Sequence, residues 1–148
     1  MVKLPPPLWT AIFLAIAAAL SAAADWPRPP GLPIVWLGAA LVAIGVAFSA
    51  AAALLFRREG TELNPISSAN RKLVTSGPFQ YTRNPMYLSL VVISLGAAIW
   101  IGAWPMFLAP LATFATANWV HIPFEEAKMR RQFGETYDAY ARKVRRWL

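Results

Sequence analysis

The sequence predicts an all-α integral membrane protein with four transmembrane helices and a cytosolic C-terminal amphipathic helical tail. Of its 148 residues, 57% are hydrophobic and only 14% are charged, and the mean hydropathy is +0.45. The apolar residues fall in long runs, which are typical of bilayer-spanning helices rather than of a soluble core. The length suits one domain, residues 1–148.

The composition excludes several classes of function. The chain has no cysteine, so it forms no disulfide framework and no thiolate metal site. Its single histidine, His121, argues against a zinc site, and we expect no metal. The formal charge of +7 suggests nucleic acid in a soluble protein. In a chain this apolar, clustered Lys and Arg instead mark cytosolic ends of spans and contacts to anionic lipid, so we expect no nucleic-acid partner.

The first span is predicted over residues 8–24. A small-residue face suited to close helix packing is formed by Ala11, Ala15, Ala18 and Ala22. The run 22–24, followed by Asp25, also resembles a signal-peptidase site, so a cleaved signal is the alternative to the retained helix that we favour. Residues 26–31 then form a tight external turn.

The second span, residues 33–56, is the longest, and small residues again recur at every fourth position, at Ala39, Ala43, Ala47 and Ala51. Residues 57–85 are predicted to be a cytosolic loop, polar and without helical or strand periodicity over 61–76.

The third span, 86–104, ends at Pro105, and the fourth, 106–120, carries Pro110 as an expected kink. The short link makes these two spans an antiparallel hairpin.

Charge and tryptophan positions orient the spans. Basic residues gather in the second loop and in the tail: Arg57, Arg58, Arg71, Lys72, Arg83, and then Lys128, Arg130, Arg131, Arg142, Lys143, Arg145, Arg146. The first loop has Arg28 alone, so the positive-inside rule places the second loop and the tail in the cytosol. We expect the membrane to be a bacterial inner membrane. The tryptophans would form two interfacial belts: Trp26, Trp36, Trp100 and Trp104, and opposite them Trp9, Trp119 and Trp147.

The tail, residues 121–148, carries an apolar stripe on a basic helix: Met129, Phe133, Tyr137, Tyr140 and Val144. Gly134 is expected to end one helix and Glu135 to begin the next. Such a helix either lies in the membrane interface or covers the polar segment 73–87.

The segment 73–87 contains Pro78 and Pro85, which lack amide donors and disfavour helix in the preceding residue. Irregular backbone beside a bilayer must be satisfied by protein or water, so this loop is a candidate site; the alternative is an ordinary connector. In the same way, Asn84 can be a helix cap, Tyr87 an interfacial anchor and His121 a solvated interface residue.

Glu125 and Glu126 follow Pro123 at the expected start of a cytosolic helix. Acidic residues are favoured there by the helix dipole, and Glu126 can pair with Arg130 four residues on. Alternatively, because adjacent helical side chains point about 100° apart, one carboxylate binds a polar ligand and the other holds Arg83 or a second substrate.

The combination of the segment 73–87, a hydrophobic hairpin, Glu125-Glu126 and the segment 133–140 resembles the isoprenylcysteine carboxyl methyltransferase family and its broader group of phospholipid methyltransferases. The resemblance covers roughly the last ninety residues. It implies an integral-membrane enzyme that uses S-adenosylmethionine without a Rossmann domain. The family's Arg-His-Pro-x-Tyr motif and its Glu-Glu pair help build the cofactor pocket, and asparagine, which cannot titrate, stands here where many relatives have histidine.

The resemblance therefore implies methyl transfer to a lipophilic acceptor, a carboxylate or an amine, at the cytosolic membrane face. We expect Arg83 and Glu126 to be catalytic. The expected cofactor-binding residues are Asn84, Pro85, Tyr87, His121, Glu125 and Glu126. The alternative is a non-catalytic membrane scaffold that binds anionic lipid through its basic tail. A transporter is disfavoured, because no predicted span contains an ionisable residue at mid-membrane.

Overall fold

The computed structural model describes residues 4–60 and 72–148, and within these ranges every regular element is helical. The helices are α1 (Pro6–Ala22), α2 (Val35–Arg58), α3 (Pro85–Ile101), α4 (Leu108–Thr116), α5 (Ile122–Phe133) and α6 (Glu135–Lys143). Two 3₁₀ turns, Gly77–Gln80 and Trp104–Phe107, precede α3 and α4, and a π-helical turn, Ala117–His121, joins α4 to α5. The predicted all-α class is thus confirmed for the described residues.

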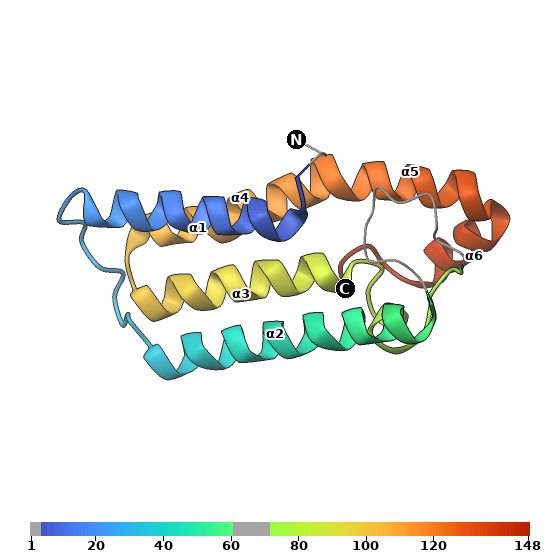
Figure 1. The fold of residues 1–148 in the computed structure, drawn as a ribbon. Coiled ribbons are helices and arrows are strands. Elements are labelled where there is room, and N and C mark those ends of the chain that lie inside the picture. Colours follow the sequence, from blue (N-terminus) through green and yellow to red (C-terminus); the bar gives the residue numbers. More distant parts are fainter. Residues whose placement is uncertain (1–3, 61–71) are drawn as a thin grey trace.

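The long helices run side by side, with α3 between α2 and α4, and with α1 packed on α4 (Figure 1). The segment from α4 through the π-helical turn into α5 is nearly straight and extends beyond the bundle, and α6 folds back from its end. The C-terminus returns to the start of α3. The polar loop, α5, α6 and the terminus therefore meet at one end of the bundle.

The helix ends follow from local sequence chemistry. Pro85 occupies the first helical position of α3, where its missing amide costs no intrahelical bond. The same helix ends at Gly102, whose positive φ of 67° suits glycine, so it stops before the predicted end at residue 104. Pro110 falls in the first turn of α4, where amide groups lack intrahelical partners in any case. It therefore helps to begin a helix instead of kinking one.

The fourth helix continues past residue 120, where the sequence predicted its end. The amide of Ile122 bonds to the carbonyl of Ala117, five residues back, so the ladder is widened just before Pro123. After this turn the helix resumes as α5. The expected break between α5 and α6 at Gly134 is confirmed.

Backbone-to-backbone contact joins α2 and α3. Helix α2 buries Gly38, Gly45 and Ala52, which recur at intervals of seven. A Cβ on Gly96 of α3 would lie 2.8 Å from the carbonyl oxygen of Gly38, so only glycine permits this approach. The two helices are locked together at this point.

The predicted small-residue faces are wrong. On α2, the predicted alanines at 43, 47 and 51 are exposed, because the heptad of glycine and alanine lies on another face. On α1, the predicted alanines are also exposed, and the helix buries Thr10 and Ala17 instead. Alanine is equally compatible with lipid and with a neighbouring helix, so its spacing did not identify the packed side.

One described helix, α2, is long and apolar enough to cross a membrane, while α1 and α3 are shorter apolar helices of 17 residues. The predicted four-span topology is therefore not confirmed. One of the two predicted tryptophan belts has its members at the same end of the bundle, near the ends of α1 and α3 and the start of α2. Its exposed members are Trp26, Trp36, Trp100 and Trp104.

Replacing Gly96 by alanine tests the α2–α3 contact. The new methyl group would meet main-chain atoms of α2, so the helices must separate, and we expect a loss of about 1–3 kcal/mol in the free energy of unfolding. Thermal unfolding in detergent measures this loss, with Ala43→Val on the exposed face of α2 as the control. Because alanine favours helix over glycine by about 1 kcal/mol, an unchanged or higher Tm would contradict the contact.

Candidate active site

The polar loop and the C-terminal tail are joined by hydrogen bonds to main-chain carbonyls. The Thr82 hydroxyl donates to the carbonyl of Arg146 at 3.2 Å, and the Asn84 side-chain amide donates to the same oxygen at 2.9 Å. The Arg83 amide donates to the carbonyl of Arg145 at 3.0 Å. Asn84 occupies the N-cap position of α3, as the helix-cap interpretation expects, but its side chain makes no capping bond and instead donates to the tail.

Arg83 is committed to the tail and to one glutamate. Its Nη1 donates to the carbonyls of Ala141 and Val144 at 2.7 and 3.0 Å, and its Nη2 donates to Glu126 Oε1 at 2.8 Å. Its side chain is only 12% exposed. Both terminal nitrogens of the guanidinium thus already have protein partners.

Glu126 is a buried carboxylate held by two arginines. Its side chain is 6% exposed, and Arg146 Nη2 lies 2.8 Å from Oε2, opposite the Arg83 contact. Burial alone would raise the pKa of Glu126, but the hydrogen bonds from Arg146 and Arg83 outweigh it and hold the pKa below its usual value. Arg130, the expected partner, is more distant at 3.9 Å. Glu126 therefore stays ionised and ties the loop, α5 and the tail together.

Glu125 faces a different set of groups. It accepts a hydrogen bond of 2.6 Å from the Tyr87 hydroxyl. Burial raises the pKa of Glu125 to about 7, against the lowering effects of the Tyr87 hydrogen bond and of the Lys128 charge. The expected division between the two carboxylates is thus present, with Glu126 on Arg83 and Glu125 directed elsewhere.

His121 completes the cluster around Tyr87. The two rings stack with centroids 6.0 Å apart and planes 22° apart. Both side chains are buried, which excludes the interfacial-anchor interpretation for Tyr87 and the solvated interpretation for His121. Among the described residues, His121 Nε2 is buried without a hydrogen-bond partner. Burial lowers the pKa of His121, which favours the neutral imidazole. Arg83 Nε and Thr113 Oγ1 are likewise buried without a hydrogen-bond partner among the described residues.

Asn118 is a site residue that the sequence analysis missed. It lies in the π-helical turn, and its Oδ1 accepts hydrogen bonds from Trp147 Nε1 at 3.1 Å and from Arg146 Nη1 at 3.5 Å. The Trp147 ring packs 4.8 Å from that of Phe114. An amide within an apolar run was the available signal.

The apolar stripe of the tail covers the loop instead of projecting into the surroundings. Tyr137 is buried, and the Tyr140 hydroxyl donates to the carbonyl of Phe79 at 2.7 Å. Of the two positions expected for this helix, the structure has the one over the loop.

The predicted site residues thus form two adjoining clusters. Arg83, Asn84 and Glu126 hold the tail, and Tyr87, His121 and Glu125 surround the unpartnered imidazole nitrogen. Pro85 is buried at the first position of α3, between Asn84 of the first cluster and Tyr87 of the second, and it has no amide hydrogen to donate. Within the described residues, no group of acidic, histidine or cysteine side chains is arranged to hold a metal ion.

The described residues thus form a bundle of mostly apolar helices with an ionisable cluster at one end, and comparison with known proteins specifies the family. Residues 33–136 match the family model for phospholipid methyltransferase. The chain belongs to this family, as the resemblance of its motifs to isoprenylcysteine carboxyl methyltransferases and phospholipid methyltransferases predicted.

Individual relatives support the same placement. The chain is 38% identical over 63 residues to an uncharacterized protein of Haemophilus influenzae, covering 43% of this chain and all of that protein. It is 29% identical over 126 residues to protein-S-isoprenylcysteine O-methyltransferase B of Arabidopsis thaliana, covering 78% of this chain and 61% of that protein. A probable enzyme of the same name from Oryza sativa subsp. indica is 29% identical over 118 residues, covering 75% of this chain and 59% of that one. The chain thus spans about three fifths of these plant relatives. No solved structure matches.

Replacing Arg83 by glutamine should release the tail. The change leaves the buried Glu126 with fewer charged partners, and we expect a loss of about 3–5 kcal/mol of stability. Hydrogen–deuterium exchange should show faster exchange in residues 141–148, with the exposed Arg131→Gln on α5 as the control. Protection of the tail equal to that in the unaltered protein would contradict this role.

Glu125 should make stability depend on pH near neutrality. Its pKa is raised from 4.5 to about 7, so between these values the folded chain binds more protons than the unfolded chain. The free energy of unfolding contributed by this group therefore falls as the pH rises from about 4.5 through 7. Denaturant unfolding between pH 5 and 8 should show this slope, and Glu125→Gln should flatten it. An equal slope in both proteins would exclude the raised pKa.

Proposed function

We propose that this chain is an S-adenosylmethionine-dependent methyltransferase that acts on a lipophilic acceptor at the cytosolic face of a membrane. The observation that carries the proposal is the cluster of Tyr87, Glu125 and His121, with one buried imidazole nitrogen unmet among the described residues. This cluster lies within the region that matches the phospholipid methyltransferase family.

The cluster suits the chemistry of that cofactor. Glu125 offers carboxylate oxygens to ribose hydroxyls, and His121 Nε2 offers one further polar contact in a buried setting. A cationic ligand nearby would favour the ionised form of Glu125, whose pKa of about 7 leaves it poised between its two forms. When bound, S-adenosylmethionine supplies a methyl group on a sulfonium, which is already a good leaving group.

Arg83 and Glu126 act as positioning residues in this proposal, which revises the catalytic role that the sequence suggested for them. Both are occupied by the tail and by each other. Their contacts fix the turn of α5 that carries Glu125, and they hold residues 141–147 against the loop. Asn84 contributes to the same closure through its bond to Arg146.

The acceptor is proposed to reach the site from the bilayer. The four bundle helices expose many apolar side chains, among them Leu8, Ile44, Trp100 and Leu111. A carboxylate acceptor needs no base, whereas an amine must lose a proton, which Glu125, with a pKa of about 7, can accept. Alignment of acceptor and methyl group accounts for the main catalytic effect, because positioning can supply about 7–11 kcal/mol.

The cytosolic placement of the site is supported by charge. Exposed basic residues lie at the end of the bundle that carries the cluster: Arg57, Arg58, Arg131, Arg142, Lys143 and Arg145. The opposite end has Arg28 in the connector between α1 and α2. By the positive-inside rule, this asymmetry supports a cytosolic placement of the site.

Calorimetric titration with S-adenosylhomocysteine tests the proposal and separates the two glutamates. Loss of a charged acceptor from a buried site should cost about 1.5–3 kcal/mol, so Glu125→Gln should bind roughly ten- to a hundredfold more weakly. Glu126→Gln should mainly lower the Tm, and Glu135→Gln, at the start of α6, is the matched control. Binding by the unaltered protein should be accompanied by transfer of labelled methyl from S-adenosylmethionine to a lipid extract.

A membrane scaffold that binds anionic lipid through its basic tail predicts the opposite results. Such a protein would bind vesicles containing anionic lipid but would not bind S-adenosylhomocysteine. Equal affinity of the two glutamine variants and the unaltered protein would remove Glu125 from the site.

A further inference from the structure

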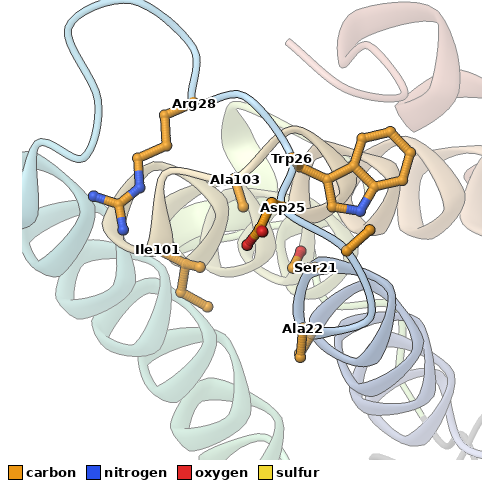
Figure 2. A pocket seen from close by; sticks show the side chains of 9 residues that line it. Ser21, Ala22, Asp25, Trp26, Arg28, Ile101 and Ala103 are labelled. Atoms are coloured by element: carbon orange, nitrogen blue, oxygen red, sulfur yellow. The ribbon is translucent and has the colours of Figure 1, made fainter.

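A polar pocket lies at the end of the bundle opposite Glu125. It has a volume of about 460 Å³, opens to the surface, and is lined by the end of α1, the connector that follows and the turn after α3. Ser21, Asp25, Trp26 and Arg28 supply its polar wall, and Ile101 and Ala103 supply part of its apolar wall (Figure 2). Helix α3, of 17 residues, separates the two ends by roughly 25 Å, so this pocket is distinct from the candidate active site.

The pocket carries one charge of each sign without an ion pair between them. No ion pair joins Asp25 or Arg28 to any residue within 4–60 and 72–148. In Figure 2 the Asp25 carboxylate lies between Arg28 and Trp26. Two opposite charges that line one cavity and leave each other unneutralised match the two ends of a zwitterion.

The helix ends indicate which side of the pocket favours the positively charged group of a zwitterionic ligand. Helices α1 and α3 both end at this pocket, at Ala22 and Ile101, so the partial negative charges of their carbonyl ends add to that of Asp25. This region favours a cationic group that can donate hydrogen bonds. Arg28, on the connector, suits a phosphate, with which guanidinium groups form two parallel bonds.

The surroundings of the pocket indicate a lipid. Trp26 lines it and is anchored by a 2.9 Å hydrogen bond from its Nε1 to the carbonyl of Leu20. Trp36, Trp100 and Trp104 are exposed at the same end, and exposed tryptophans gather at the level of lipid headgroups. Ile101, 47% exposed at the rim, offers an apolar surface to the glycerol and upper chain carbons.

We infer that this pocket binds the headgroup of a zwitterionic aminophospholipid, with the ammonium at Asp25 and the phosphate at Arg28. The lipid is a bound structural partner at the face opposite the candidate active site and is not the methyl acceptor. The inference rests on the membrane placement in the proposed function, but it does not depend on methyl transfer.

Native mass spectrometry of delipidated protein in detergent tests this site, with phosphatidylethanolamine, phosphatidylglycerol and soluble glycerophosphoethanolamine as probes. The unaltered protein should retain phosphatidylethanolamine about tenfold better than phosphatidylglycerol, which lacks the ammonium. Asp25→Asn should abolish this preference, and Arg28→Gln should weaken retention of both lipids about tenfold. Ala22→Phe, which fills the pocket and keeps both charges, should weaken both as well.

The exposed Arg131→Gln and Glu135→Gln serve as charge-matched controls and should change neither ratio. An unchanged preference in Asp25→Asn, or equal binding of the soluble headgroup and the lipid, would overturn the inference. Affinity for S-adenosylhomocysteine is measured in the same samples and should not change in the pocket variants. If the unaltered protein binds S-adenosylhomocysteine but shows no preference for phosphatidylethanolamine, only this site is refuted. If it shows the lipid preference but does not bind S-adenosylhomocysteine, only the proposed function is refuted.

Discussion

The buried Glu126 carboxylate is the interaction on which the arrangement of this end of the molecule depends. An ion removed from water costs several kcal/mol unless its partners are well placed, and here guanidinium groups from the loop and from the tail supply them. Because Arg83 and Arg146 lie far apart in sequence, one carboxylate closes a ring of loop, α5 and tail. Its helical neighbour Glu125 is thereby held beside Tyr87, so a structural ion pair determines where the adjacent, functionally interesting carboxylate sits.

The two adjacent glutamates have opposite electrostatic settings although both are removed from water. The pKa of Glu126 is lowered because two arginines donate to it, whereas the pKa of Glu125 is raised because a tyrosine hydroxyl cannot compensate for burial. One group is a fixed charge, and the other can change its protonation state near neutral pH. The separation follows from helix geometry, since a rotation of about 100° directs consecutive side chains to different neighbours.

The sequence allowed the helices to be predicted better than their packing. Long apolar runs ended by proline or glycine located α1, α2 and α3 to within a few residues, because such residues act locally. The packed face was missed: alanine suits lipid and protein alike, whereas Gly38 and Gly96 mattered through a contact between distant segments. For the site, motif order brought Arg83, Tyr87 and the glutamates to attention. The main-chain partners of Arg83 could not be predicted, because every residue has a carbonyl group and the sequence does not show which ones accept.

This use of main-chain carbonyls has an evolutionary consequence. Thr82, Arg83 and Asn84 recognise the path of the tail at residues 141, 144, 145 and 146 and largely ignore the side chains there. Arg146 and its neighbour Trp147 also have side-chain partners, and Val144 belongs to the apolar stripe, so residues 141 and 145 are the positions that the closure constrains through the backbone alone. The match to the family model ends at residue 136, before this stretch. Substitutions at residues 141 and 145 can therefore leave the same closure intact.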